Sequence, residues 1–329
     1  DPARGIFILA FLVVMIGGSL TLYAWRAPLL KSKAGFELTS RESFLLFNNL
    51  LLIVATATVF AGTMAPLISD ALGLGTLSVG PQYFNPTFLL PMLPLAALAA
   101  VGMHASWKKG RVSERKGMLL TTFAMSAVIA LAMILGAFGG PMLLTPVGLA
   151  LGAWIMLSAL ADPFDRLRRK LKLTPSIIGM SLAHFGLGLF ILSITVVETY
   201  TAERDVAMAV GDRATVGNFE YRFDKLDPVE GPNYDGVRGE ITVLQDGKKI
   251  GTLHPEKRQY WVQRSVMTEA GIDMQLTRDV FAALGEDLGA GRWSVRAQIR
   301  PMINYVWLAA FIMALGGVVA ATDRRYRTA

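Results

Sequence analysis

Seven uninterrupted apolar runs, each long enough to cross a bilayer as a helix, dominate the sequence. They cover residues 5–25, 43–62, 88–106, 118–138, 142–161, 177–197 and 302–321. About 20 residues at ~1.5 Å rise per residue span the ~30 Å hydrocarbon core of a membrane. The composition agrees, because 53% of the 329 residues are hydrophobic and only 17% are charged, against about 25% in soluble domains. The sequence therefore predicts a polytopic α-helical membrane protein with seven transmembrane helices.

The connections between these runs alternate in charge. Lys and Arg gather in every second connection, namely 26–42, 107–117, 162–176 and the tail after 321. The alternate connections, 63–87 and 139–141, contain neither residue. By the positive-inside rule the basic connections and the C-terminus lie in the cytoplasm. The net charge of +7 then reflects topology, and no nucleic-acid partner is predicted.

This topology puts Asp1 on the outer side of the membrane, because the number of spans is odd. The chain begins there without a Met and without a basic signal segment. We therefore expect it to be the later part of a longer polypeptide.

Residues 198–300 differ in kind from the rest of the chain. Aromatic and charged residues alternate over 219–224, which is typical of a half-buried strand. Residues 240–253 predict a hairpin with a type I′ turn at Asp246-Gly247. Alternation returns over 292–300, and residues 277–284 are expected to form one helix. The segment is thus predicted to be a small external, mainly-β domain.

Three domains follow from this division. Residues 1–197 hold six transmembrane helices with short loops, 198–300 form the β-rich domain, and 301–329 carry the last transmembrane helix and a basic cytoplasmic tail.

Several kinds of chemistry are excluded or disfavoured. The chain has no Cys, so disulfides, thiolate metal sites and Cys nucleophiles are excluded from it. Its three His residues lack paired metal-ligand spacing, and no Walker, dinucleotide or catalytic-triad pattern is present. Spans two to seven hold no carboxylate near the midplane, which disfavours an ion-coupled transporter.

One ionisable side chain, His184, lies inside an apolar run, roughly 10 Å along the helix axis from Ile177. An ionisable group at such a depth indicates a functional site. Ser181 and Gly188 share its helical face and are small. Small neighbours let a flat macrocycle approach the backbone, which suits an axial haem ligand. The residues equally allow an imidazole that is hydrogen-bonded to a neighbouring helix.

The other two His residues are not placed to complete a bis-His site. His104 lies at the cytoplasmic edge of the third run and is interpreted as structural, and His254 lies in the outer domain and is interpreted as a solvated surface residue. A second axial ligand would come from another segment.

The second run has a distinct entry and two polar residues. Thr39 and Glu42 have the spacing of a capping box, which predicts a helix start near Ser40. Asn48 and Asn49 then follow inside the run. They are predicted to make interhelical hydrogen bonds, with the lining of a cofactor or quinone pocket as the alternative.

Six short stretches, taken together and in order, resemble a known family. They are 39–43 (TSRES), 46–50 (LFNNL), 80–85 (GPQYFN), 183–186 (AHFG), 231–234 (GPNY) and 255–258 (PEKR). The chain is similar to the C-terminal half of CcmF, the haem-lyase family of bacterial system I cytochrome c maturation.

The resemblance implies an inner-membrane protein with residues 198–300 in the periplasm and lipid around its spans. It implies that haem is taken from the CcmE chaperone and attached to the CxxCH motif of apocytochrome c, with CcmH and CcmI as partners. It also implies a membrane b-type haem that reduces the delivered iron, with quinol as a plausible donor. His184, in its Ala-His-x-Gly context, matches one of the two axial ligands of that haem.

Two features of the family do not occur in this sequence. The Trp-rich haem-binding segment and the second transmembrane His are absent, and both are implied to lie in an N-terminal half outside this chain. Two other functions stay open: a haem-free scaffold whose β domain docks partners, and a quinol-linked electron carrier without attachment activity.

Overall fold

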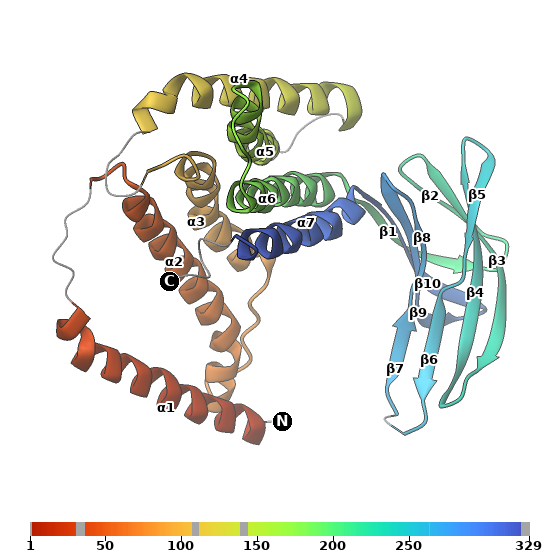
Figure 1. Ribbon diagram of the computed structural model, residues 1–329. Helices are drawn as coiled ribbons and strands as arrows, with labels where there is room; N and C mark the ends of the chain where they lie inside the picture. Colours follow the sequence, from red (N-terminus) through yellow and green to blue (C-terminus); the bar gives the residue numbers. More distant parts are fainter. Residues whose placement is uncertain (1, 31–36, 107–111, 139–143, 263, 324–329) are drawn as a thin grey trace. The chain divides into compact units, whose positions relative to one another are not determined.

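A computed structural model describes residues 2–30, 37–106, 112–138, 144–262 and 264–323. These residues form two compact units, Asp1–Thr122 and Phe123–Ala329, and each unit is described by itself (Figure 1). The part of the chain that the structure describes contains seven helices long and apolar enough to cross a membrane, as predicted. They are α1 (Pro2–Arg26), α2 (Arg41–Ala71), α3 (Pro81–Gly102), α4 (Lys116–Met133), α5 (Thr145–Arg168), α6 (Pro175–Tyr200) and α7 (Ile303–Ala321).

In the first unit α2 and α3 pack closely near the middle of α2. Gly62 faces the rings of Tyr83 and Phe84, and a Cβ at this position would lie 2.4 Å from the Tyr83 ring. The Tyr83 hydroxyl donates to the carbonyl oxygen of Thr58 at 2.9 Å. A glycine is therefore required where the aromatic start of α3 meets α2.

Both helices are longer than the apolar runs at 43–62 and 88–106 that predicted them. The predicted 63–87 loop is largely helical, because α2 continues through Pro66 to Ala71 and α3 begins with Pro81 in its first turn. The prediction of a loop was wrong for most of 63–87 because proline usually ends a helix, whereas membrane helices tolerate it.

The cap of α2 lies one residue later than the Thr39–Glu42 pattern predicted. The Ser40 side chain accepts a hydrogen bond from the backbone N–H of Ser43 at 3.4 Å, and the helix begins at Arg41. The predicted helix start near Ser40 is therefore confirmed, with Ser40 and not Thr39 as the capping residue.

In the second unit α6 lies between α5 and α7. Gly188 of α6 meets the backbone of α5 at Gly152, and Gly179 of α6 meets the backbone of α7 at Gly316. Small residues at such crossings let two helix backbones approach closely. A buried cluster also joins α5 and α6 to α4 and to the π-helical turn that follows it: Ala130, Ile134, Leu149, Ala153, Leu192 and Val196.

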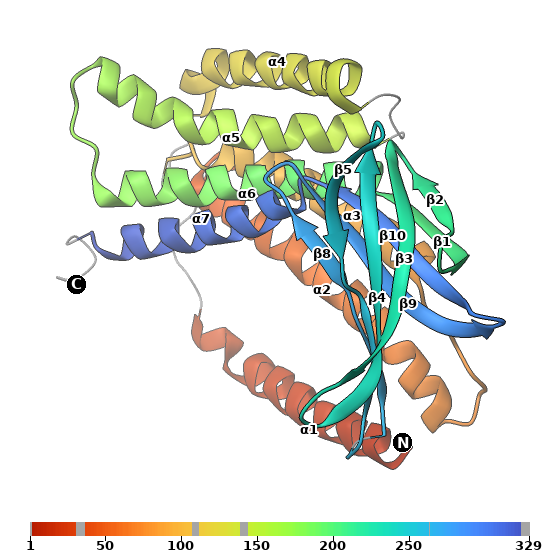
Figure 2. The ribbon, with the colours of Figure 1, turned by 90° about the vertical axis from the view of Figure 1, so that its right-hand side faces the viewer.

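The segment between α6 and α7 is a sandwich of two antiparallel sheets. The sheets are seen edge-on in Figure 1 and face-on in Figure 2. Its strands are β1 (Ala202–Ala209), β2 (Arg213–Val216), β3 (Phe219–Glu230), β4 (Tyr234–Gln245), β5 (Lys248–Leu253), β6 (Glu256–Tyr260), β7 (Val266–Glu269), β8 (Gly271–Met274), β9 (Arg278–Gly289) and β10 (Arg292–Pro301). One sheet has the order β1-β10-β9-β8, and the other β2-β3-β4-β6-β7 with β5 also paired to β4.

The predicted helix over 277–284 is wrong, because this segment is the first half of β9. Val280, Ala282 and Leu284 alternate into the core and are fully buried. The local Ala and Leu content favours a helix, but burial of every second side chain between two sheets overrides that preference.

The hairpin at Asp246-Gly247 is confirmed. Both residues have positive φ, 50° and 76°, as a type I′ turn requires. The turn joins β4 to β5 with two residues, and a bulge shifts the register of this pair between Val243 and Leu244.

A single residue connects the sandwich to each of its two neighbouring helices. Thr201 separates α6 from β1, and Met302, with φ of 58°, separates β10 from α7. The backbone N–H of Met302 donates to the carbonyl oxygen of Thr277 at 2.9 Å, and the Asn304 side chain donates to the carbonyl oxygen of Gln275 at 2.9 Å. The β8–β9 turn is thus hydrogen-bonded to the first turn of α7.

Candidate functional site

The imidazole of His184 is half-buried on α6 and has a defined orientation. Its Nδ1 lies 2.9 Å from the carbonyl oxygen of Met180, one turn earlier. A carbonyl oxygen only accepts, so Nδ1 is the donor, and in the neutral imidazole Nε2 then carries the lone pair. This is the tautomer that ligates metals through Nε2, with the other ring nitrogen held by a backbone carbonyl. The interhelical hydrogen bond that was the alternative is not made among the described residues.

The two small residues predicted beside His184 have different surroundings. Gly188 faces α5, where a Cβ would lie 2.6 Å from the Gly152 carbonyl oxygen and 2.6 Å from the Met156 side chain. Helix packing therefore explains its size, and the space beside it is filled by α5 and not open to a macrocycle. Ser181 is buried, and its hydroxyl has no hydrogen-bond partner within the described chain.

The residues around His184 fit a cofactor bound through one nitrogen. Within the described ranges there is no group of three or more His, Asp or Glu residues that could hold a bare metal ion. A haem would need only one ligand from this helix, because the porphyrin holds most of the iron's coordination positions itself. The imidazole is only partly buried, and Nε2 makes no hydrogen bond among the described residues that would compete with such a group.

Asn48 and Asn49 lie in the first unit, on α2. Asn48 is half-buried and Asn49 is exposed, and the Asn48 amide donates to the Asn49 side-chain oxygen at 3.4 Å. The hydrogen bond connects neighbours on one helix, in contrast to the predicted interhelical bond. A role in a cofactor or quinone pocket stays a prediction.

The exposure of His254 agrees with its interpretation as a surface residue, and the structural role of His104 stays a prediction. His254 is exposed between β5 and β6, and His104 is half-buried in the turn that follows α3. Trp154, on α5, packs edge-on against Phe123 with ring centroids 5.1 Å apart.

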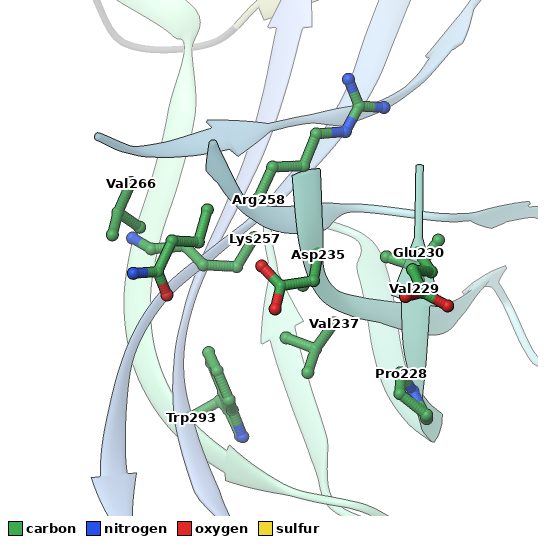
Figure 3. A pocket seen from close by; sticks show the side chains of 11 residues that line it. Pro228, Val229, Glu230, Asp235, Val237, Lys257, Arg258, Val266 and Trp293 are labelled. Carbon is green, nitrogen blue, oxygen red and sulfur yellow. The ribbon is translucent and has the colours of Figure 1, made fainter. Parts of the chain in front are cut away.

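A second candidate site is an open cavity of about 550 Å³ in the β sandwich, drawn in Figure 3. Its lining residues come from both sheets: Pro228, Val229, Glu230, Asp235, Gly236, Val237, Lys257, Arg258, Gln259, Val266 and Trp293. It lies at the end of the sandwich opposite the helices, because Trp293 follows the β9–β10 turn whereas the other end of β10 leads into α7.

Three polar groups of this cavity, Asp235, Lys257 and Gln259, occupy the inner face of the six-stranded sheet. Asp235 is paired in register with Gln259, and Val237 with Lys257, so all four side chains lie on one face. Figure 3 shows Asp235, Lys257 and Trp293 around the same space. Asp235 and Lys257 are charged residues at inward positions at this end of the sandwich. Sequence reasoning missed the site, because its strands are distant in the chain.

An ion-pair cluster stabilises the strand behind the cavity. Glu256 is buried and accepts hydrogen bonds from Arg238 and from Arg258, the latter at 2.7 Å. Burial alone would raise the pKa of Glu256, but the hydrogen bonds from the two guanidinium groups outweigh it and hold the pKa below its usual value. Arg258 also lies over the Tyr234 ring, 4.6 Å from its centroid.

Sequence similarity to known proteins covers nearly the whole chain. The family model described as "CcmF C-terminal beta-sandwich" matches residues 199–301. The chain is 47% identical to the cytochrome c-type biogenesis protein CcmF of Pseudomonas aeruginosa and 41% identical to that of Escherichia coli. Each match covers 99% of this chain and 50% of the relative, so the chain spans about half the length of these curated relatives.

The fold also matches a solved structure. A structure named "Cytochrome c Heme Lyase CcmF" superposes with a TM-score of 0.72 at 18% identity, over 87% of this chain and 46% of the other. At that identity the likeness shows the fold alone. The family model and the sequence matches show that this chain, with its seven candidate membrane spans, is similar to the C-terminal half of the CcmF cytochrome c-type biogenesis proteins.

Proposed function

We propose that this chain is the C-terminal portion of a cytochrome c haem lyase, in which His184 is an axial ligand of a membrane b-type haem. The observation that carries the proposal is the hydrogen bond between His184 Nδ1 and the Met180 carbonyl, which directs Nε2 away from its own helix. The sequence similarity to CcmF proteins along the chain supports the same function.

The residues of this chain would hold and orient the cofactor. The Met180 carbonyl sets the His184 tautomer, and the close crossings of α6 with α5 and α7 fix the helix that carries it. A haem held by this imidazole would supply an electron carrier in the membrane. In this proposal the second axial ligand comes from outside the chain.

The lyase function would need partners beyond this chain. We place the sandwich in the periplasm and the C-terminus in the cytoplasm, because Lys and Arg gather in 162–176 and after 321. Haem would arrive from CcmE and be joined to CxxCH of apocytochrome c together with CcmH, CcmI and the N-terminal half of the protein. Its iron must be ferrous and the cysteines reduced, so we infer a role for the b haem as reductant with quinol as donor.

The test is an absorption spectrum of the purified full-length protein, with covalent cytochrome c counted in cells. We expect His184→Ala to lower the Soret band and to reduce cytochrome c, because one axial ligand is lost. His254→Ala is the matched control, since His254 is exposed on the sandwich, and it should change neither reading. An unchanged Soret band in His184→Ala would refute the ligand assignment.

Quinol oxidation is tested separately. Addition of a quinol to the oxidised protein should produce the ferrous haem spectrum in the wild type, and His184→Ala should slow or abolish that change. A wild-type haem that stays ferric with quinol would remove the donor proposal and leave the ligand assignment intact.

A second function, partner docking, is favoured by the open cavity at Trp293. We propose that the cavity receives a segment of a partner protein. Charge reversal at Asp235 and Lys257 should reduce co-purification of the maturation partners without changing haem content. Lys249→Glu, an exposed residue of the β4–β5 hairpin, is the control. Unchanged co-purification in the cavity variants would exclude docking at this site.

A further inference from the structure

The first turn of α7 marks the level of the membrane boundary on the side of the β domain. The helix has 19 residues, which at 1.5 Å per residue is about 28 Å, close to the thickness of the hydrocarbon core. Tyr305 and Trp307 lie in its first two turns, and Trp307 is 72% exposed. Such aromatic residues anchor helix ends at the membrane–water interface.

The turn between β8 and β9 is fixed at this level. The Asn304 side chain donates to the Gln275 carbonyl oxygen at 2.9 Å and to the Asp279 carboxylate at 2.6 Å. The Met302 N–H donates to Thr277 at 2.9 Å. These bonds hold the turn beside the first turn of α7, and hence at the interface.

The helix face that bears Asn304 is the face that α7 leaves exposed. Trp307 and Phe311 follow Asn304 at helical spacing on that face, and both are mostly exposed. The opposite face packs on α6, where Gly316 meets the α6 backbone. The β8–β9 turn therefore projects over the unpacked side of α7.

The β8 edge exposes apolar side chains next to this turn. Ile272, Met274 and Leu276 are 49%, 73% and 75% exposed. Ile272 is paired in register with Phe281 of β9, whose ring lies 4.8 Å from the Arg300 guanidinium. An apolar edge with a stacked guanidinium matches the acyl and phosphate parts of a phospholipid interface.

The position of β8 at the end of its sheet places this edge to one side of α7. The helix α7 follows β10, and β8 is two strands farther along the sheet, roughly 10 Å at ~4.8 Å per strand. Figures 1 and 2 agree that this four-stranded sheet is the layer of the sandwich on the side of α6 and α7.

We propose that the β8 edge, defined by Ile272, Met274 and Leu276, is seated in the headgroup region of the bilayer beside α7. The occupant of this surface is the phospholipid leaflet. Lipid is the occupant because the edge extends the exposed apolar face of a membrane-spanning helix, at the level where that helix leaves the hydrocarbon core.

The absence of cysteine in the chain makes a labelling test direct. An environment-sensitive fluorophore is attached to Leu276→Cys or to Met274→Cys. Each variant is made in an otherwise cysteine-free full-length protein, which is placed in phosphatidylcholine nanodiscs. Two quenchers are compared, a nitroxide attached to lipid near the headgroup and aqueous iodide. Val262→Cys is the matched control, since Val262 is 91% exposed at the opposite end of the sandwich.

Labels at 274 and 276 are expected to show blue-shifted emission, strong quenching by the lipid nitroxide and weak quenching by iodide. The label at 262 should show the reverse. Iodide quenching at 274 and 276 equal to that at 262 would overturn the proposal by placing the edge in water. Protection from both quenchers would overturn it by showing that protein covers the edge.

Discussion

A Cβ on Gly188 would lie 2.6 Å from the carbonyl oxygen of Gly152, so the α5 and α6 backbones touch at this pair. Gly188 is one helical turn from His184. The helix that carries the candidate ligand is thus positioned by a contact between main chains, which leaves little freedom to shift.

Gly188→Ala should therefore destabilise the protein, by roughly 2 kcal/mol, since overpacking a tight contact costs this much. The control is Gly317→Ala on α7, where a Cβ would have no other atom within 4 Å among the described residues. There alanine should be neutral or stabilise by up to about 1 kcal/mol, because it is the better helix former. Thermal unfolding in detergent distinguishes the two. Equal midpoints would contradict a backbone contact at Gly188.

His184→Gly should lose the haem absorption and regain part of it on addition of free imidazole. The variant leaves a cavity of the shape of the lost ring, and an added imidazole can supply the missing nitrogen. The measurement is a titration of the Soret band with imidazole. His254→Gly, titrated in parallel, should start with full absorption and should not respond. Full haem occupancy in His184→Gly before imidazole is added would contradict the prediction.

The Glu256 cluster should make the sandwich sensitive to acid. The folded-state pKa of Glu256 lies below its usual value of 4.5, so its contribution is complete above that pH and is lost as the pH falls through the folded-state pKa. We expect Glu256→Gln to lower stability at pH 7 by about 2 kcal/mol and to flatten the loss of stability below pH 4.5.

Hydrogen exchange in β4 and β6, corrected for the intrinsic pH dependence of exchange, measures this effect in the intact protein. Glu286→Gln, at an exposed position of β9, is the control and should retain the wild-type pH profile. Identical profiles for wild type and Glu256→Gln would show that this carboxylate is not the acid-sensitive group.

Asn304→Leu should loosen the joint between sandwich and α7. The change removes both side-chain donors and leaves the Gln275 carbonyl and the Asp279 carboxylate without them, at a cost of about 2 kcal/mol. Exchange should rise in the β8–β9 turn and remain unchanged in β3. Thr322→Val, which removes a hydroxyl bond at the other end of α7, should not raise exchange in the turn. Unchanged exchange in Asn304→Leu would show that the turn is held by other contacts.

Local patterns predicted the features that depend on local chemistry. The apolar runs predicted seven spans, and Asp246-Gly247 predicted a type I′ hairpin, because hydropathy and positive φ are properties of short segments. The hydrogen bond of His184 is local too, since its partner Met180 is four residues away, whereas the role of His184 as a haem ligand stays a prediction.

Features that depend on distant partners were missed or misread. The β9 strand looked helical because only the second sheet makes alternation at Val280 and Ala282 favourable. Gly188 was predicted to make room for a macrocycle beside His184, whereas in the structure α5 fills that space. The cavity at Trp293 joins strands whose pairing no local pattern reveals.

The single-residue joints at Thr201 and Met302 have a mechanical consequence. A domain on long linkers absorbs an applied force by reorienting, whereas this sandwich has no slack at either attachment. A torque applied by a molecule that binds the sandwich passes directly into α6 and α7, and therefore into the helix that carries His184.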